Sequence, residues 1–498
     1  MLSELISKID GIMWGTPLVI ICLTAGMFFS LIMKFPQIRL IKDLITTSFK
    51  GTGKGEKLSP FETLSIAVGG RVGTGNITGT ASAIFFGGPG AVFWMWIMCL
   101  IGTASSFAES VLAQIWKERD SSEFYGGPPF YILKGLKIKP LATLWASVAL
   151  FFTIIFSGVQ SSSFVAVASY TTNIDPVIWG LIFTVPLAIL VLGGAKRIAK
   201  ASSIIVPFMS IAYVLASLIV VVMNISQVPA VFGMIFRSAF TPGAVFGGAF
   251  GTVISWGVKR GIFSNEAGLG TAPLVAGRAE TSHPAKIGLS QSFSVYIDTL
   301  VICTATALAI LLSGCYNVSG VSGELLVQNM PGVEYSQFAA VAFDSIIPKW
   351  GSLFLTFVLF LFNFTTISSY PVYLGSNKHF LFGRDGNEKR AANAMKLVNI
   401  SIIVMAFLGS IVSIDTLWNL ASALSGLMSF INIICCILLY KPVVATLKDY
   451  EKQKKKGIDP VFVPENCGIE NAELWDTIVE EEYKEELAAY KKTFSYNS

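Results

Sequence analysis

The feature of this chain that most constrains its fold is a series of long apolar runs. About 20 consecutive apolar residues cross the hydrocarbon core of a bilayer as a helix. On that rule we expect eleven spans, at residues 13–33, 61–86, 91–116, 140–168, 177–193, 202–224, 244–265, 286–313, 350–377, 394–412 and 416–440. Charged residues make up only 13% of the 498, against roughly a quarter in a soluble domain. The sequence therefore predicts an all-α integral membrane protein.

Lysine and arginine are concentrated in alternate connections between these runs. The basic connections are residues 34–57, 117–139, 196–200, 278–286, 384–396 and the segment from 441 onward. The opposite connections carry only Lys8, Arg237 and Lys349. Because basic residues are retained on the cytoplasmic side, we expect a multi-pass protein of the plasma membrane with its N-terminus outside and its C-terminus in the cytoplasm.

The chain divides into a membrane domain and a polar C-terminal part. Residues 1–442 hold all of the apolar runs, whereas residues 443–498 are rich in Lys and Glu. Such charge runs are typical of a solvated segment. We expect residues 443–498 to form a solvated cytoplasmic tail, with a regulatory role as the alternative.

The second apolar run is interrupted by the segment Gly69-Gly70-Arg71-Val72-Gly73-Thr74-Gly75-Asn76. Glycines this dense disfavour a regular helix, because each gains backbone freedom when the helix unwinds. Inside a bilayer the freed N–H and C=O groups have no water partner, so such a break is tolerated where it lines a protein cavity. We interpret it as a discontinuous transmembrane helix whose backbone binds a solute. Close helix packing through glycine is the alternative.

A second interruption falls in the run at 244–265. It contains the segments Gly247-Gly248-Ala249-Phe250-Gly251-Thr252 and Ser264-Asn265-Glu266-Ala267-Gly268. If the run at 13–33 is an extra N-terminal helix, the two broken helices are the first and sixth of ten and cross in opposite directions. A 5+5 inverted repeat with a broken first helix in each half is typical of one class of secondary transporter. We expect the first repeat at 61–224 and the second at 244–440.

The first break has the chemistry to bind an anionic group and a cation. Backbone N–H groups at the start of a half-helix attract a carboxylate, because the helix dipole is positive there. Carbonyl groups at the end of the other half-helix can coordinate a small cation, and Thr74 and Asn76 add side-chain oxygens. Gln160 and the pair Thr365-Thr366 place further polar groups within other apolar runs.

Three charged residues also fall within the expected spans, namely Arg71, Glu109 and Asp298. Charges at membrane depth pair with one another or line a transport pathway. We therefore expect either an ion pair between Arg71 and one of the acids or direct contact with the substrate.

Other classes of function are disfavoured by the sequence. The seven cysteines have no CxxC spacing and both histidines lie in polar loops, so neither a metal centre nor a histidine-based catalytic site is indicated. The segment Gly51-Thr52-Gly53-Lys54-Gly55 lacks the glycine spacing and the hydroxyl residue of a phosphate-binding loop. We therefore expect no enzyme, no cofactor and no nucleic acid partner, and we expect transport to be driven by an ion gradient.

From about Pro60 into the tail the chain contains a series of distinctive segments: GRVGTGNITG, FFGGPGAVFWMW, FAES, GGPPFYI, GGAKRI, VPFMS, RGIFSNEAGLGTAP and LFG. Together these segments resemble the alanine or glycine:cation symporter family, within the amino acid–polyamine–organocation superfamily. The resemblance implies a leucine-transporter-like fold with 11 transmembrane helices. It also implies Na⁺-coupled, occasionally H⁺-coupled, uptake of small neutral amino acids.

The resemblance further implies which residues bind the solutes. The amino acid would contact Gly73, Thr74, Gly75, Asn76, Phe156, Gln160, Phe250, Gly251, Thr252 and Tyr370. The Na⁺ ion would be held by Gly70, Val72, Gly73, Thr365 and Thr366. The chain departs from the family in the run at 350–377, where Ser369-Tyr370-Pro371-Val372-Tyr373 replaces a Gly-Trp pair followed by Ser-Tyr-Tyr-Gly. Because these positions lie near the expected pocket, the substrate can differ from alanine.

The sequence thus favours a Na⁺-coupled symporter that imports a small neutral amino acid, alanine or glycine first, by alternating access. The alternatives are H⁺-coupled transport of another small amino acid, an amino-acid-gated channel, and a membrane-embedded enzyme or receptor. Paired broken helices argue against a channel, which has no use for them. The expected partners are the amino acid, Na⁺ and the lipid bilayer, and the oligomeric state stays open, a monomer included.

Overall fold

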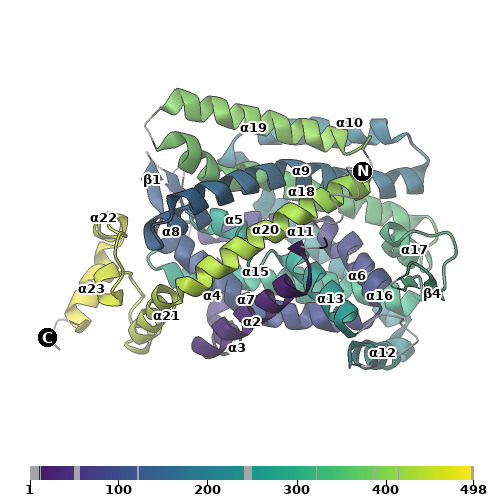
Figure 1. The fold of residues 1–498 in the computed structure, drawn as a ribbon, viewed down its shortest axis with the longest axis horizontal. Helices are drawn as coiled ribbons and strands as arrows, with labels where there is room; N and C mark the ends of the chain where they lie inside the picture. The colour runs from purple at the N-terminus through teal and green to yellow at the C-terminus, as the bar shows by residue number, and fades with distance from the viewer. Residues whose placement is uncertain are drawn as a thin grey trace.

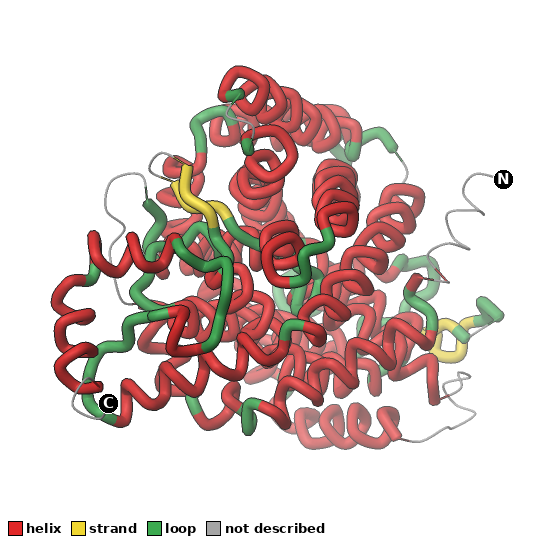
Figure 2. The backbone as a smooth tube through the Cα atoms, turned by 60° about the vertical axis from the view of Figure 1, so that its left-hand side comes forward, coloured by secondary structure: helices red, strands yellow, loops and turns green. Residues whose placement is uncertain are grey.

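The structure, a computed structural model, consists almost wholly of helices (Figure 1, Figure 2). It describes residues 11, 13–49, 57–120, 123–240, 250–320, 322–384, 387–412 and 414–494. Within these residues, seven helices are long and apolar enough to cross a membrane. They are α7 (Gly90–Ile115), α9 (Lys139–Thr172), α11 (Ala195–Met223), the continuous helix formed by α15 (Pro284–Val295), η4 (Tyr296–Cys303) and α16 (Thr304–Ser313), α18 with η6 (Trp350–Lys378 and His379–Gly383), α19 (Glu388–Leu408) and α20 (Ile414–Leu438).

Every expected apolar run coincides with one of these helices or with a shorter one. The shorter ones are α2 (Thr16–Ile32), α5 (Pro60–Arg71), α6 (Thr80–Gly87), α10 (Pro176–Val191) and α13 (Phe250–Asn265). The remaining helices are α3 (Pro36–Arg39), α4 (Ile41–Phe49), α8 (Pro128–Gly135), α12 (Val228–Phe240), α14 (Ala272–Ala276), α17 (Phe338–Asp344), α21 (Tyr440–Lys455), α22 (Leu474–Glu482) and α23 (Lys484–Phe494). The short 3₁₀ turns η2 (Ile225–Gln227), η5 (Tyr335–Gln337) and η7 (Pro464–Cys467) lie between them.

Helix α11 shows why these elements belong in a bilayer. Its side chains Ile204, Phe208, Ile211 and Leu215 recur at helical spacing and are 57–65% exposed. Water would make such an exposed stripe costly, whereas lipid tails accept it. The opposite face of α11 packs inward on α5 and α18, whereas most residues of α7 are buried.

The first expected break is present. Helix α5 begins with a capping box at Ser59 and Glu62 and ends at Arg71, after which Val72 is extended (φ −76°, ψ 93°). The chain resumes as a wide π-helical turn, η1 (Gly75–Gly79), which leads into α6. We call α5, η1 and α6 together the first broken helix.

The second broken helix, α13 and α14, is interrupted at the later of the two segments that we expected. Residues 241–249 lie outside the described residues, and Gly251 and Thr252 belong to α13. The break is at residues 266–271, where Glu266, Gly268 and Gly270 have φ values of 55°, 87° and 89°. L-residues rarely adopt this left-handed backbone, so Glu266 is held there by its surroundings, described below.

Two antiparallel hairpins mark opposite ends of the molecule (Figure 1, Figure 2). One hairpin pairs β1 (Glu118–Asp120) with β2 (Glu123–Tyr125) and lies at the end that also carries α21, α22 and α23. The other pairs β3 (Asn317–Ser319) with β4 (Leu325–Gln328) and lies near α12 and α17. We call these the tail end and the opposite end.

The tail is packed on the membrane domain rather than free in solvent, which corrects the expected solvated tail. Trp475 of α22 is fully buried, donates its indole N–H to the Gln114 carbonyl oxygen at 3.0 Å, and lies under the Lys117 ammonium. The Phe462 amide donates to the Ser282 carbonyl oxygen at 2.9 Å. The tail is polar overall, but a few of its apolar side chains are buried where it packs on the membrane domain. They are Val461, Phe462, Trp475 and Ile478.

Candidate functional site

The two helix breaks lie against each other near the centre of the molecule. A Cβ placed on Gly75 of η1 would be 3.2 Å from the Ser264 Cα atom of α13. The unwound backbone of one broken helix therefore faces the end of the other half-helix, as expected for a pair of discontinuous helices around one site.

The N–H groups of the first break are bound by side-chain amide oxygens. Gly73 N–H donates to Asn76 Oδ1 at 2.8 Å, and Thr74 N–H donates to Gln160 Oε1 of α9 at 2.9 Å. A Cβ on Gly73 would lie 2.7 Å from Thr366 Oγ1 and 2.8 Å from Gln160 Oε1, so only glycine admits this approach. The break thus presents two adjacent N–H donors to acceptor oxygens, the arrangement that a carboxylate needs.

Oxygen atoms from the first break and from α18 gather around the Thr366 hydroxyl group. Thr366 Oγ1 is 2.9 Å from the Gly69 carbonyl oxygen, 3.2 Å from that of Val72 and 2.9 Å from that of Phe362. Thr365 Oγ1 is also 2.9 Å from the Phe362 oxygen. One hydroxyl proton can serve only one of these carbonyls. We call these five oxygens the Thr366 cluster, and oxygen-only sets of this kind suit a hard cation.

The expected cation ligands are only partly in this cluster. Val72, Thr365 and Thr366 contribute oxygens, and the Gly69 carbonyl does so in addition. Gly70 instead lies against α18, where a Cβ would be 2.1 Å from the Tyr373 hydroxyl oxygen. The Gly73 N–H is directed to Asn76.

A buried carboxylate forms a second polar centre beside the break. Asp298 of η4 accepts hydrogen bonds from Asn76 Nδ2 at 2.6 Å, Ser264 Oγ at 2.8 Å and Thr299 Oγ1 at 2.8 Å. Asp298 and Asn76 are both fully buried and both lie in π-helical turns. Such turns recur at functional sites because they widen the helix locally.

Glu109 of α7 stabilises the break of the second broken helix. Its carboxylate accepts from the Gly268 N–H at 3.2 Å and from Asn432 Nδ2 at 2.8 Å, and Asn432 also donates to the Gly268 carbonyl at 2.9 Å. The side chain of Glu266 accepts from Thr271 Oγ1 at 2.8 Å within the same loop. These bonds satisfy backbone groups that have no helical partner.

The expected ion pair of Arg71 with Glu109 or Asp298 is not found in the described part of the chain. Arg71 donates instead to the Gln291 carbonyl oxygen at 3.2 Å and to the hydroxyl groups of Ser294 and Ser106. The Glu109 and Asp298 carboxylates accept hydrogen bonds from uncharged donors. Arg71 and these two acids therefore each have separate hydrogen-bond partners.

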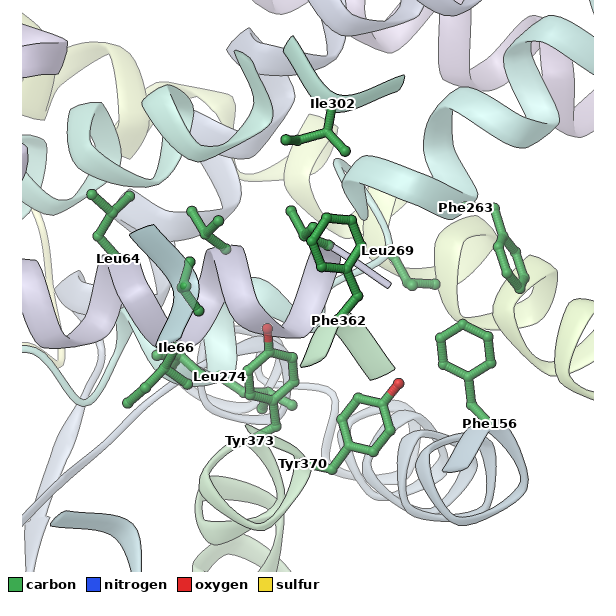
Figure 3. Packing of buried hydrophobic residues seen from close by; sticks show 14 of the residues in the cluster. Leu64, Ile66, Phe156, Phe263, Leu269, Leu274, Ile302, Phe362, Tyr370 and Tyr373 are labelled. Atoms are coloured by element: carbon green, nitrogen blue, oxygen red, sulfur yellow. The ribbon is translucent and has the colours of Figure 1, made fainter. Parts of the chain in front are cut away.

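Aromatic side chains from three helices gather close to Gln160, and Figure 3 shows Phe156, Phe263 and Tyr370 near one another. The Phe156 ring packs edge-to-face against Phe263 with centroids 5.1 Å apart and lies parallel to Tyr370 at 6.2 Å. Phe263 stacks on Trp418 of α20 at 5.1 Å. Phe156 and Tyr370, two of the expected substrate contacts, thus lie beside each other, and Phe263 and Trp418 continue the same aromatic cluster.

Two expected residues are not brought to this site. Gly251 and Thr252 begin α13, and Gly251 is exposed. At 1.5 Å per residue, they lie roughly 20 Å along the helix from the break that follows Asn265. The side chain of Phe250 is outside the described residues.

Several residues of the site were not predicted from the sequence. Asn363 of α18 donates to the Gln160 carbonyl oxygen at 2.8 Å and accepts from Thr74 Oγ1 at 3.2 Å. Ser264 and Asn432 bind the two buried carboxylates. Asn363 and Asn432 are amides flanked by apolar residues, and buried amides need several partners, so for these two an amide in mid-run was the available signal.

The model of the sodium:alanine symporter family matches residues 1–464. YrbD of Bacillus subtilis (strain 168), named as a sodium/proton-dependent alanine carrier protein, is 46% identical over 95% of this chain and 98% of its own. GlnT of the same organism, named as a sodium/glutamine symporter, is 39% identical over 93% of each chain.

A solved structure of the same fold is that of MhsT in complex with L-phenylalanine. The TM-score is 0.55 at 15% identity, over 86% of this chain and 96% of that one. That likeness supports the leucine-transporter-like fold and no more. The family match and the two relatives, each covering nearly the whole chain, settle the identity: the chain belongs to the sodium:alanine symporter family, whose members are amino acid transporters of the membrane.

Proposed function

We propose that this protein is a Na⁺-coupled symporter that imports a small neutral amino acid by alternating access. The observation that carries the proposal is the pairing, at one helix break, of two N–H donors at Gly73 and Thr74 with the adjacent Thr366 cluster. A carboxylate and a cation would each find complementary groups within one unwound turn. Transport leaves the solute chemically unchanged, so no enzymatic activity and no cofactor besides the coupling ion are proposed.

The substrate carboxylate would take the place of the Gln160 oxygen on the Thr74 N–H. Gln160 would then rotate and offer its amide to the bound amino acid. Gly75 and Asn76 would complete this side of the pocket, because Asn76 already accepts from the Gly73 N–H. Exchange of one acceptor oxygen for another keeps the buried N–H satisfied in both states, which avoids the cost of an unpaired donor.

The coupling Na⁺ would bind in the Thr366 cluster. A second cation could bind between Asn76 and Asp298, next to the substrate carboxylate. Asp298 has neutral donors only, so its charge at membrane depth is available to a cation.

Phe156 and Tyr370 would limit the size of the substrate side chain. Both are at most 3% exposed, and their rings face the same region as Phe263. Alanine and glycine are the first candidates. Because one relative is named for alanine and another for glutamine, serine and glutamine are the competitors to test against them.

The proposed topology has eleven spans, with α2 as the extra helix and two five-helix inverted repeats. The tail end would face the cytoplasm of a cell with this protein in its plasma membrane. In support, that end carries Lys57, Lys117, Arg119, Lys286 and Lys454, all in contact with the tail or its docking surface. Basic residues are retained on this side during insertion.

A second candidate is H⁺ coupling, favoured by Asp298. A carboxylate bonded only to an amide and two hydroxyl groups can take up and release a proton without losing its partners. The name of YrbD includes both ions, so the two ions have to be separated by experiment.

Uptake by purified protein in liposomes tests these proposals. We expect labelled alanine to accumulate when an inward Na⁺ gradient is imposed, and unlabelled glycine, serine or glutamine to compete according to size. Liposomes with equal Na⁺ on both sides and an imposed pH gradient are the matched condition. Accumulation driven by the pH gradient alone would show that the coupling ion is H⁺ and not Na⁺. Lack of accumulation of every amino acid under both gradients would refute the proposed function.

A further inference from the structure

Arg278 follows α14 and joins three elements at the tail end. Its guanidinium group donates to the Val372 carbonyl oxygen of α18 at 3.0 Å and pairs with the Glu123 carboxylate of β2 at 3.0 Å. It also lies over the Tyr125 ring, 5.3 Å from the centroid. The Arg278 side chain is 5% exposed, so this charge is withdrawn from water while the three elements are together.

Helix α18 has a shape that admits this contact. A Cβ on Gly375 would lie 2.4 Å from Arg278 Nη1, so any larger residue would displace the guanidinium group. Pro371, one residue before Val372, lies inside the helix. Arg278 therefore donates to a helical carbonyl next to this proline, in a space that Gly375 leaves open.

The segment that carries Arg278 is also tied to the start of α5. Leu58 forms an isolated bridge with Ala279, and the Glu280 N–H donates to the Leu58 carbonyl oxygen at 2.9 Å. Ser59, the next residue, caps α5. A contact that fixes residue 278 thus fixes the tail-end halves of both broken helices relative to α18 and the hairpin.

Glu123 is suited to hold Arg278. Burial alone would raise the pKa of its carboxyl group, but the Arg278 charge, the Tyr125 hydroxyl and Lys378 together lower that pKa below its ordinary value. The carboxylate is therefore ionised at neutral pH, and Arg278 has a charged partner on the hairpin.

Another face of α18 indicates that the region does not stay closed. Tyr373 and Asn377, one helical turn apart, are at most 1% exposed, and their polar side-chain atoms have no hydrogen-bond partner among the described residues. The Tyr373 hydroxyl lies against Gly70 of α5. Burying such groups without partners costs free energy. A face that carries them suits an interface that separates and meets water.

We propose that Arg278 is a gate residue, whose contacts with Glu123 and the Val372 carbonyl close the cytoplasmic side of the transporter. In the inward-open state these contacts break, and the α5-facing side of α18 is hydrated. Arg278 does not touch the solutes and acts through the positions of α14, α5 and α18. The inference rests on the proposed function, since only a carrier requires this end to open and close.

The test uses the variant Asn377→Cys, which places a reporter cysteine on the buried face of α18. The variant is studied in inside-out membrane vesicles, in which the cytoplasmic side faces the added reagent. A membrane-impermeant thiol reagent should label it slowly, and Glu123→Gln should increase the labelling rate by roughly three- to tenfold. Loss of a charge-assisted hydrogen bond can shift an equilibrium by about tenfold or more, and the partial exposure of Glu123 reduces that effect. The chain without the reporter cysteine gives the background, since six of its seven cysteines are buried.

Arg119→Gln is the matched control. Arg119 lies on the same hairpin and pairs with Glu481 of the tail at 2.9 Å, so its loss should leave the labelling rate unchanged. Glu123→Asp, which keeps the negative charge opposite Arg278, should label more slowly than Glu123→Gln, which a merely misfolded hairpin would not do. Gly375→Ala, by displacing the guanidinium group, should resemble Glu123→Gln.

Transport kinetics supply a second readout. Glu123→Gln should raise the external half-saturation concentration for alanine roughly three- to tenfold, because the outward-facing state is less populated, with the maximal rate within about twofold. Unchanged labelling and unchanged half-saturation in both Glu123→Gln and Gly375→Ala would overturn the gate. If the unaltered chain transports no amino acid, the proposed function is wrong. The labelling rates would still show whether the Arg278 contact controls access to the buried face of α18.

Discussion

Asn76 Nδ2 lies 2.6 Å from Asp298 Oδ1, and this bond joins the unwound turn of the first broken helix to the π-helical turn η4. The same amide accepts from the Gly73 N–H through Oδ1. One side chain thus couples the backbone that would bind a carboxylate to a buried acid that would bind a cation. Substrate and ion would then affect each other's binding through Asn76, which offers one physical route for coupled transport.

Asp298→Asn removes the charge from this centre while keeping a similar volume. We expect the half-saturation concentration for Na⁺ to rise by about ten- to a hundredfold, the equivalent of a lost charge-assisted hydrogen bond of roughly 1.5–3 kcal/mol. Measurement of Na⁺-dependent uptake in liposomes checks this. Asp175→Asn, at the exposed start of α10, is the control. An unchanged Na⁺ dependence would remove Asp298 from the cation site.

Gln160 can be tested through the charge of its replacement. Gln160→Ala frees the Thr74 N–H but removes an amide from the pocket, so alanine binding should weaken by roughly tenfold. Gln160→Glu places an anionic oxygen on the same N–H, where it repels the substrate carboxylate, and should weaken binding further. Binding to the purified, folded variants gives the order. Equal binding by Gln160→Glu and the unaltered protein would show that the carboxylate binds elsewhere.

Thr366→Val tests the Thr366 cluster, because it keeps the shape of the side chain and deletes the hydroxyl group. We expect Na⁺ affinity to fall by about tenfold with little change in the melting temperature. Ser368→Ala is the matched control, since Ser368 Oγ donates to the Thr365 carbonyl of its own helix at 3.1 Å and has no other partner among the described residues. If both variants change Na⁺ affinity equally, the cluster is not specific for the ion.

Local chemistry made much of this fold predictable. Apolar runs located the helices, and the glycines from Gly69 to Gly75 located the first break, because few folds tolerate such a segment in a bilayer. The second break was located in part. Of the two segments named for it, the later one contains Glu266 and Gly268, which adopt the left-handed backbone, whereas Gly251 and Thr252 are helical. Glu109, far away in sequence, stabilises the break.

Partners distant in sequence were the part that could not be predicted. Arg71 and the acids looked complementary, but only packing shows that Arg71 meets Gln291, Ser294 and Ser106. The tail was misjudged for the same reason. Its composition is that of a solvated segment, and the few apolar residues that dock it have no periodic pattern to mark them.

The cluster around Glu118 should make stability depend on pH. Burial would raise the pKa of this carboxyl group, but His379, Lys134 and Arg384 together lower it to about 2 from an ordinary value of 4.5. A depressed pKa stabilises the fold above the ordinary value, and that contribution is lost as the pH falls from 4.5 toward 2. Glu118→Gln should therefore lower the melting temperature at pH 7 and pH 5 equally, and the difference should shrink toward pH 3.

Melting curves of the detergent-solubilised protein at these three values measure the effect. Glu324→Gln, at an exposed position near the opposite end, should show no such difference. A gap that widens as the pH falls would mean that Glu118 is not ionised in the folded protein.

Trp475→Ala tests the docking of the tail. The indole is fully buried, donates to the Gln114 carbonyl at 3.0 Å and contacts Phe462, with centroids 5.1 Å apart. Truncating a buried tryptophan costs about 3–5 kcal/mol. That loss falls on the contact between tail and membrane domain, so the tail should detach by local opening while the membrane helices stay folded. Trypsin added to inside-out vesicles should then cut near Lys454, Lys455 and Lys456 at least about tenfold faster than in the unaltered protein.

The control is Trp350→Ala, which changes a tryptophan that is 71% exposed at the start of α18. This variant should leave the cleavage rate unchanged. Equal cleavage of Trp475→Ala and the unaltered chain would mean that the tail is held by its ion pairs, such as Lys57 with Glu482, and not by the buried indole.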